Sequence, residues 1–285
     1  MKNMKQKINK LTSRSPFYCW IIVLLCSAFL FYKYVMQVSP SIMTFELMKA
    51  FNVNATGLGV LAATFFFTYF ITQVFVGVLL DRFSPRHLSA FALLMSALGT
   101  YAFAKSHSLF DASLSRSLMG IGAAFATVTY MKLAANWFPK EKFAFIGGLL
   151  ATAAMLGAIF GEAPLAHLVD TVGWRDSLVI CAWIGFLIAF LFFIFVRNAP
   201  QTSLINSSSA SKQSISFNDI KAVFSKKQNW LLTAYSGMAF SPIAVFGGLW
   251  GNTFIIESYH FSRTTAATLI SMCFFGLAVG GPLLG

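Results

Sequence analysis

The sequence predicts an all-α polytopic membrane protein, and three observations carry this prediction. Hydrophobic residues make up 57% of the chain, charged residues make up 11%, and the mean hydropathy is +0.71. Soluble domains, in contrast, carry about 25% charged residues. The apolar residues also gather in eight long runs. Each run is close to or above the roughly 20 residues that a helix needs to cross a bilayer, so we expect a bundle of eight membrane-spanning helices.

These runs follow one another with short polar loops between most of them. They cover residues 16–44, 56–80, 87–104, 108–135, 143–169, 177–196, 229–256 and 264–284. The first run is longer than the apolar part of a signal peptide and no small-residue cleavage pattern follows it, so it should remain as a span. We therefore expect a basic cytoplasmic tail (1–15), a six-helix N-terminal half (16–196), a cytoplasmic linker (197–228) and the first two helices of a second half (229–285).

The distribution of basic residues predicts the orientation. Fifteen of the 21 Lys and Arg residues fall in the tail, the linker and the loops on their side, and four fall in the loops on the other side. Cytoplasmic loops carry the excess of Lys and Arg, so the N terminus should be cytoplasmic, in a multi-pass protein of the bacterial inner membrane. These loops also explain the net charge of +12. No basic, aromatic-interleaved soluble domain is present, so a nucleic-acid partner is not expected.

Catalytic and cofactor sites are not indicated. The four cysteines lie inside apolar runs without the spacing of metal ligands, so neither a disulfide, a metal site nor another cofactor is expected. A membrane-embedded enzyme would need a nucleophile beside a base, or paired carboxylates. The nine acidic residues and four histidines lie mostly in loops. A secondary transporter, a pore and a non-transporting remnant remain, although the ring of charge or repeated filter segment of a channel is not seen.

A short charged loop joins the second and third runs. Within residues 77–86, Gly77 should permit close helix packing, and Asp81 can cap a helix end or pair with a base. Arg82 and Arg86 should hold this face in the cytoplasm. Two interpretations stay open, a gating loop and a charged hairpin that only fixes the topology.

An internal repeat appears when the chain is shifted by 208 residues. Phe66-Phe67 then meets Phe274-Phe275, and Asn54-Ala-Thr56 meets Ser262-Arg-Thr264 as polar residues at helix starts. The shift places the seventh and eighth spans on the first and second. Two parallel halves of six spans would give this arrangement.

On three local patterns the chain resembles the major facilitator superfamily of transporters. Residues 77–86 resemble its loop motif, 116–122 its Arg-x-x-x-Gly-x-Gly pattern of span four, and 157–164 part of its Gly/Pro pattern of span five. Ser84 and Pro85 depart from the usual glycine and base. The first half also resembles the lysosomal dipeptide-transporter branch. Members have two six-span halves, so this chain is expected to be truncated, with spans seven and eight poorly packed and little transport alone. In the family the loop motif docks on a second-half helix that this chain lacks.

Charged residues inside spans are the candidate substrate or ion contacts. Lys33 should lie near the bilayer midplane beside Tyr34 and Gln37. A lone lysine there costs about 2.5–3.5 kcal/mol, so it should face a wet cavity or a partner. Substrate contact and a structural tie to an acid are both open.

Arg116 and Glu162 form the second candidate. They should lie at similar depths below the outer surface, which predicts an ion pair. The pair is either structural or a proton switch. The resemblance favours the switch, because the span-four arginine of the family often faces the translocation path.

The expected function is secondary active transport by alternating access. A cavity lined by Lys33, Arg116 and Glu162 has a net positive charge, which suits a small organic anion or a zwitterion such as an amino acid or a short peptide. The expected partners are this small-molecule substrate and the lipid bilayer, with protons as a candidate coupling ion.

Overall fold

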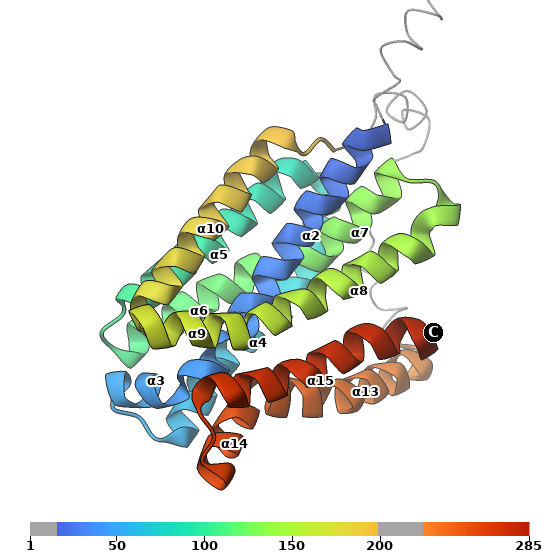
Figure 1. Cartoon of the computed structure of the whole chain (residues 1–285). Coiled ribbons are helices and arrows are strands. Elements are labelled where there is room, and N and C mark those ends of the chain that lie inside the picture. Colours follow the sequence, from blue (N-terminus) through green and yellow to red (C-terminus); the bar gives the residue numbers. More distant parts are fainter. Residues whose placement is uncertain (1–15, 199–224, 285) are drawn as a thin grey trace, which may run out of the picture.

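The computed structural model describes residues 16–198 and 225–284. The predicted tail and most of the predicted linker lie outside the described residues. Within them, eight helical segments are long and apolar enough to cross a membrane, and no strand is formed (Figure 1). These segments match the eight predicted runs in order, which confirms the all-α polytopic fold.

Several spans are built from more than one helical piece. The first span joins α2 (Pro16–Val38), the 3-10 turn η1 (Ser39–Met43) and α3 (Thr44–Phe51), the fourth joins α6 (Leu109–Ala123) and α7 (Phe125–Trp137), and the fifth joins η2 (Lys140–Lys142), α8 (Phe143–Phe160) and α9 (Ala163–Val172). The seventh joins α13 (Lys227–Pro242), the π-helical η3 (Ile243–Trp250) and α14 (Gly251–Tyr259). The second, third, sixth and eighth spans are the single helices α4 (Ala55–Arg82), α5 (Pro85–Lys105), α10 (Trp174–Phe195) and α15 (Arg263–Leu284).

Helix starts agree with the predicted repeat. The Asn54 side chain accepts a hydrogen bond from the Gly57 amide (2.9 Å), which caps α4. At the positions 208 residues later, the Ser262 hydroxyl accepts from the Thr265 amide (3.2 Å) at the start of α15. Side-chain oxygens at the N-cap satisfy amides that have no partner within the helix. The second span of each half therefore begins with the same cap.

The irregular segments also correspond. η1 and η3 interrupt the first and seventh spans at overlapping positions of the repeat, and they pack against each other. Pro40 at the start of η1 and Pro242 just before η3 lack the amide hydrogen of a regular helix. Broken helices at the interface between repeats commonly line transporter substrate sites.

The first six spans share one apolar core. α5 packs between α6 and α10, α4 packs on α6, and α2 packs on α7 and α8. Large side chains such as Phe29, Phe65 and Met119 are fully buried in this core. A few polar contacts cross it, among them the bond from the Tyr32 hydroxyl to the Thr100 hydroxyl (2.9 Å). The outer faces stay apolar and exposed, as lipid contact requires.

Span eight packs on the first half, contrary to prediction. α15 lies along α8 and α9 (Figure 1), where Ala266, Ala267, Ile270 and Phe274 are buried. Small residues at the crossing let the helix backbones approach. From Met272 to Gly280 only Phe274 is buried, so the packing is concentrated in the first half of α15. α13, in contrast, contributes no buried residue, as predicted for a poorly packed helix.

Candidate functional site

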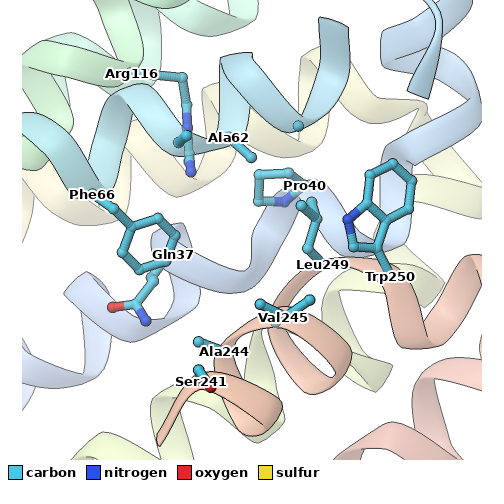
Figure 2. A pocket seen from close by; sticks show the side chains of 13 residues that line it. Gln37, Pro40, Ala62, Phe66, Arg116, Ser241, Ala244, Val245, Leu249 and Trp250 are labelled. Atoms are coloured by element: carbon cyan, nitrogen blue, oxygen red, sulfur yellow. The ribbon is translucent and has the colours of Figure 1, made fainter. Parts of the chain in front are cut away.

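A cavity of about 340 Å³ lies between the first half and span seven (Figure 2). Its walls come from α2, η1, α4 and α6 on one side, and from α13 and η3 on the other. Most of its lining is apolar, and its polar side chains are those of Gln37, Arg116, Ser241 and the indole of Trp250. The volume falls at the lower end of the range of about 300–1,000 Å³ for small-molecule sites. The cavity is therefore large enough for a small ligand and offers it few polar side chains.

Among the described residues, Arg116 is the only charged one that lines this cavity, and it is 1% exposed. Its Nη1 donates to the main-chain oxygen of Met36 (2.9 Å), and its guanidinium lies 4.9 Å from the Phe65 ring centroid. Its Nε and Nη2 are buried and have no hydrogen-bond partner. Figure 2 shows the side chain reaching from α6 toward the space between Phe66 and Pro40. Two donors on one edge of a buried cation thus lack a partner among the described residues.

The three candidates on α2 are brought together near this cavity. Gln37 lines it directly, whereas Tyr34 lines a smaller pocket on the other side of Gln37. Lys33 is 5% exposed, and its Nζ lies 3.7 Å from the ring centroid of Tyr34 and 5.1 Å from that of Tyr69. None of the ion pairs between described residues includes Lys33. The ion pair with an acid, one of the two open interpretations of Lys33, is therefore not formed. The ammonium group instead makes cation–π contacts with two aromatic rings.

Glu162 lies at the break between α8 and α9 and is fully buried. Gly161 ends α8, Pro164 stands in the first turn of α9, and the turn between them directs Glu162 toward η1 and α14. One carboxylate oxygen accepts a hydrogen bond from the Ser41 hydroxyl (2.7 Å), and the other accepts from the Asn252 amide (2.5 Å). Glu162 therefore joins spans one, five and seven.

The predicted ion pair between Arg116 and Glu162 is wrong for this structure. Among the described residues, the ion pairs are Lys132 with Asp81, and Arg263 with Glu46 and Asp170. Similar depth in the membrane does not bring the two side chains together, because Arg116 points to the carbonyl of Met36 and Glu162 points to span seven. The two groups belong to separate sites.

Comparison with known proteins decides the family. A sequence model described as "Major Facilitator Superfamily" matches residues 21–285. The chain belongs to this superfamily. Its members are membrane transporters and not enzymes, which confirms the prediction made from the sequence.

Related sequences of this superfamily cover most of the chain. The chain is 26% identical over 235 residues to the "Hexuronate transporter" of Bacillus subtilis (strain 168), an alignment that covers 81% of this chain and 56% of that protein. It is 24% identical over 219 residues to the "Probable L-galactonate transporter" of Escherichia coli (strain K12), which covers 73% and 48%. The chain thus spans about half the length of these two relatives.

Solved structures of the superfamily have the same fold. A crystal structure of a bacterial homologue of the human lysosomal transporter Spinster, inward-facing and unoccupied, matches with a TM-score of 0.74 at 16% identity. The match covers 95% of this chain and 63% of that one. None of the three relatives named above is called a dipeptide transporter. The resemblance of the first half to the lysosomal dipeptide-transporter branch therefore stays a prediction.

The superfamily loop motif ties helix ends together within the first half. Asp81 pairs with the base Lys132 at the end of span four, one of the two roles expected for it. The Arg86 Nε donates to the main-chain oxygen of Phe193 (2.7 Å) on α10. The Arg82 side chain is exposed and forms no hydrogen bond with another described residue. Gly77 is also exposed, and a Cβ atom there would meet nothing within 4 Å, so its predicted role in close packing is wrong.

Close packing depends instead on the glycines of spans four and five. A Cβ at Gly120 would collide with the main-chain oxygen of Phe65, and one at Gly122 with that of Ala92. Gly157 and Gly161 press in the same way against α2. The Arg-x-x-x-Gly-x-Gly pattern therefore sets the position of α6, and with it the position of the Arg116 guanidinium.

The sequence interpretation missed the residues that span seven and η1 contribute. The sequence predicts only that they lie inside the apolar runs 16–44 (Ser41) and 229–256 (Trp250 and Asn252). A buried amide in a span, such as Asn252, is rare enough to be a signal by itself. The repeat offers a second signal, because Asn252 falls 208 residues after Thr44, which lies beside Ser41 and η1.

Proposed function

We propose that this chain forms the substrate-binding region of a secondary transporter that moves a small carboxylate anion by alternating access. The observation that carries the proposal is the free edge of Arg116, whose Nε and Nη2 have no partner among the described residues and belong to a buried side chain in a cavity between the halves. A planar guanidinium offers such an edge to a carboxylate as two parallel hydrogen bonds.

The cost of burial supports this ligand. An ionised side chain without a partner in the membrane interior is expensive, so it is kept where it faces a cavity, a ligand or a counter-ion. The Arg116 side chain makes one hydrogen bond to another described residue, and no acidic side chain of the described part of the chain lines the cavity. An anionic ligand would supply the missing charge and both missing acceptors.

The related proteins support an anion over a zwitterion. Their names include hexuronate, L-galactonate, ascorbate, sulfoacetate and phosphate transporters, and these substrates are anions at neutral pH. The cavity itself is mostly apolar, and no acidic group lines it to receive the ammonium of an amino acid or peptide. We therefore favour a small monocarboxylate such as a sugar acid.

The arrangement of the halves supports alternating access. α14 and the first half of α15 pack on the ends of spans one and five, whereas α13 contributes no buried residue. The basic loops favour an N terminus on the cytoplasmic side of the bacterial inner membrane. The packed ends of spans one and five would then lie on the outer side of the membrane. The structure would then correspond to a form closed on the outside.

Direct binding tests the proposal. The purified chain in lipid nanodiscs should bind labelled glucuronate, and unlabelled monocarboxylates should compete. Glucose, which has the same ring without the carboxylate, and a neutral amide of the same acid should not compete. Equal competition by glucose, or preferential binding of an amino acid, would refute the carboxylate assignment. Uptake into proteoliposomes then shows whether the bound anion is also carried.

A further inference from the structure

Glu162 forms a fully buried polar contact between the two halves. It is 0% exposed, and the residue that binds it from span seven, Asn252, is 1% exposed. The three side chains make a closed set of bonds, because the Asn252 amide nitrogen also contacts the Ser41 hydroxyl (3.2 Å). The cavity lining includes none of these three residues, so this cluster is separate from the Arg116 site.

No cation among the described residues neutralises Glu162. Arg263, at the start of α15, pairs with Glu46 and Asp170. Arg116 is bonded to Met36. The other basic side chains on the elements packed around it either lie over aromatic rings (Lys33) or are exposed (Lys49, His167 and His260), and the nearby acid Glu257 is exposed as well. A carboxylate buried in this position is either neutralised by a cation that it binds, such as a proton, or remains charged without a counter-ion.

The Asn252 side chain can serve either charge state. Its amide nitrogen now donates to the carboxylate, and its Oδ1 is buried without a hydrogen-bond partner. Turning the amide by half a rotation would place that oxygen against Glu162, where it could accept a hydrogen bond from the protonated carboxyl group. Amide groups have one acceptor and two donors, so the same residue can bind the ionised and the protonated acid. A protonated Glu162 would give the unpartnered Asn252 oxygen the hydrogen-bond donor that it lacks, which points to a proton as the ligand of this cluster.

We propose that Glu162 is a proton-binding site, distinct from the anion site, and that its proton stabilises the closed contact between spans five and seven. Closing the contact takes the carboxyl group out of water, and a bound proton removes the charge that would otherwise be buried unpaired. Opening returns the group to water, where it releases the proton. Only the alternating-access part of the proposed function is assumed, and not the identity of the substrate.

Distance measurements between two spin labels test this proposal. Labels at Lys49→Cys on α3 and Ser258→Cys on α14, in a chain whose four native cysteines are replaced, report the separation of the halves at this end. In nanodiscs, acidification from about pH 9 to about pH 4, the range over which carboxyl groups titrate in proteins, should shift the population toward the short distance. Glu162→Gln should hold the short distance at every pH.

Controls make each outcome decisive. Glu46→Gln removes a neighbouring acid that already has a cationic partner, and it should keep the pH response. A wild-type chain that ignores pH, a Glu162→Gln chain that responds like wild type, or a response to sodium at fixed pH would each overturn the proposal. Because the labels report conformation and not uptake, failure to transport an anion would count only against the proposed function.

A chemical probe keeps the test independent of any variant. Dicyclohexylcarbodiimide modifies protonated carboxyl groups in apolar surroundings. At about pH 7, where exposed carboxyl groups are ionised, mass spectrometry of the wild-type chain should find the modification at Glu162 and not at the exposed Asp81. Absence of modification at Glu162 would overturn the proposal.

Discussion

Arg116 donates a hydrogen bond to the main-chain oxygen of Met36, 2.9 Å away, and this bond fixes the guanidinium of span four to the backbone of span one. Met36 lies one turn before the break at η1, and its carbonyl is close to the interrupted part of the helix. A main-chain acceptor holds the arginine without neutralising it. The cation is thus oriented and still available to an anion, which no arrangement with an acidic partner would allow.

The shape of Arg116, and not only its charge, should determine binding. Arg116→Lys keeps the charge but loses the flat edge formed by Nε and Nη2. Hydrogen bonds to charged groups contribute about 1.5–3 kcal/mol each, so glucuronate binding should weaken by about 10-fold or more, since each 1.4 kcal/mol is a factor of ten. Equilibrium binding to the purified variants measures this.

A matched control is available at Arg175. Its guanidinium also bonds to main-chain oxygens, those of Ala104 (2.7 Å) and Ser106 (2.8 Å), but it does not line the cavity. Arg175→Lys should leave glucuronate affinity unchanged. If both lysine variants bind as the wild type does, the assignment of Arg116 to the carboxylate fails.

Lys33 should be needed for transport and dispensable for folding. Its ammonium group is buried over Tyr34 and Tyr69 without an acidic partner, so Lys33→Met leaves no stranded charge behind. We expect uptake or binding of the anion to be lost while the amount of protein in the membrane stays near normal. Lys33→Arg, which keeps a cation over the rings, should retain part of the activity. A collapse of membrane abundance in Lys33→Met would instead show a structural role.

The spans could be predicted from the sequence because membrane crossing depends on length and hydropathy, two properties that a single chain displays. The first span was placed too short, at residues 16–44, because α3 continues the helix to Phe51 with an amphipathic turn that includes Glu46 and Lys49. Helix caps were also predictable, since Asn54 and Ser262 act through amides three residues away.

Contacts between spans were less predictable, because depth in the membrane gives one coordinate and the rotation of each helix is not visible in the sequence. Arg116 and Glu162 have similar depths, yet the break at Gly161 turns Glu162 toward Asn252. Gly77 illustrates the same limit, since a glycine on a helix face is useful only if another backbone passes close to it. The candidate residues were therefore found, but their partners were not.

Double-mutant cycles should separate the predicted pair from the observed one. Glu162 and Asn252 are in direct contact, so Glu162→Gln and Asn252→Ala should show a coupling of about 0.5–3 kcal/mol in unfolding free energy. Among the described residues, the Arg116 and Glu162 side chains share no hydrogen-bond partner, so the effects of Arg116→Gln and Glu162→Gln should add within about 0.5 kcal/mol. Thermal unfolding in detergent gives the four stabilities of each cycle. Strong coupling between Arg116 and Glu162 would indicate that they meet in another conformation of the protein.

The glycine of span four should be more sensitive to a methyl group than the glycine of the loop motif. A Cβ at Gly122 would collide with the main-chain oxygen of Ala92 and would lie 2.8 Å from the Ser96 amide nitrogen, so α5 and α6 would have to move apart. Overpacking of this kind costs about 1–3 kcal/mol, and Gly122→Ala should lower the Tm by several degrees. It should also weaken anion binding, because a displaced α6 moves Arg116. Gly77→Ala has free space around it and should keep both the Tm and the affinity of the wild type, so equal effects of the two substitutions would contradict the packing described for span four.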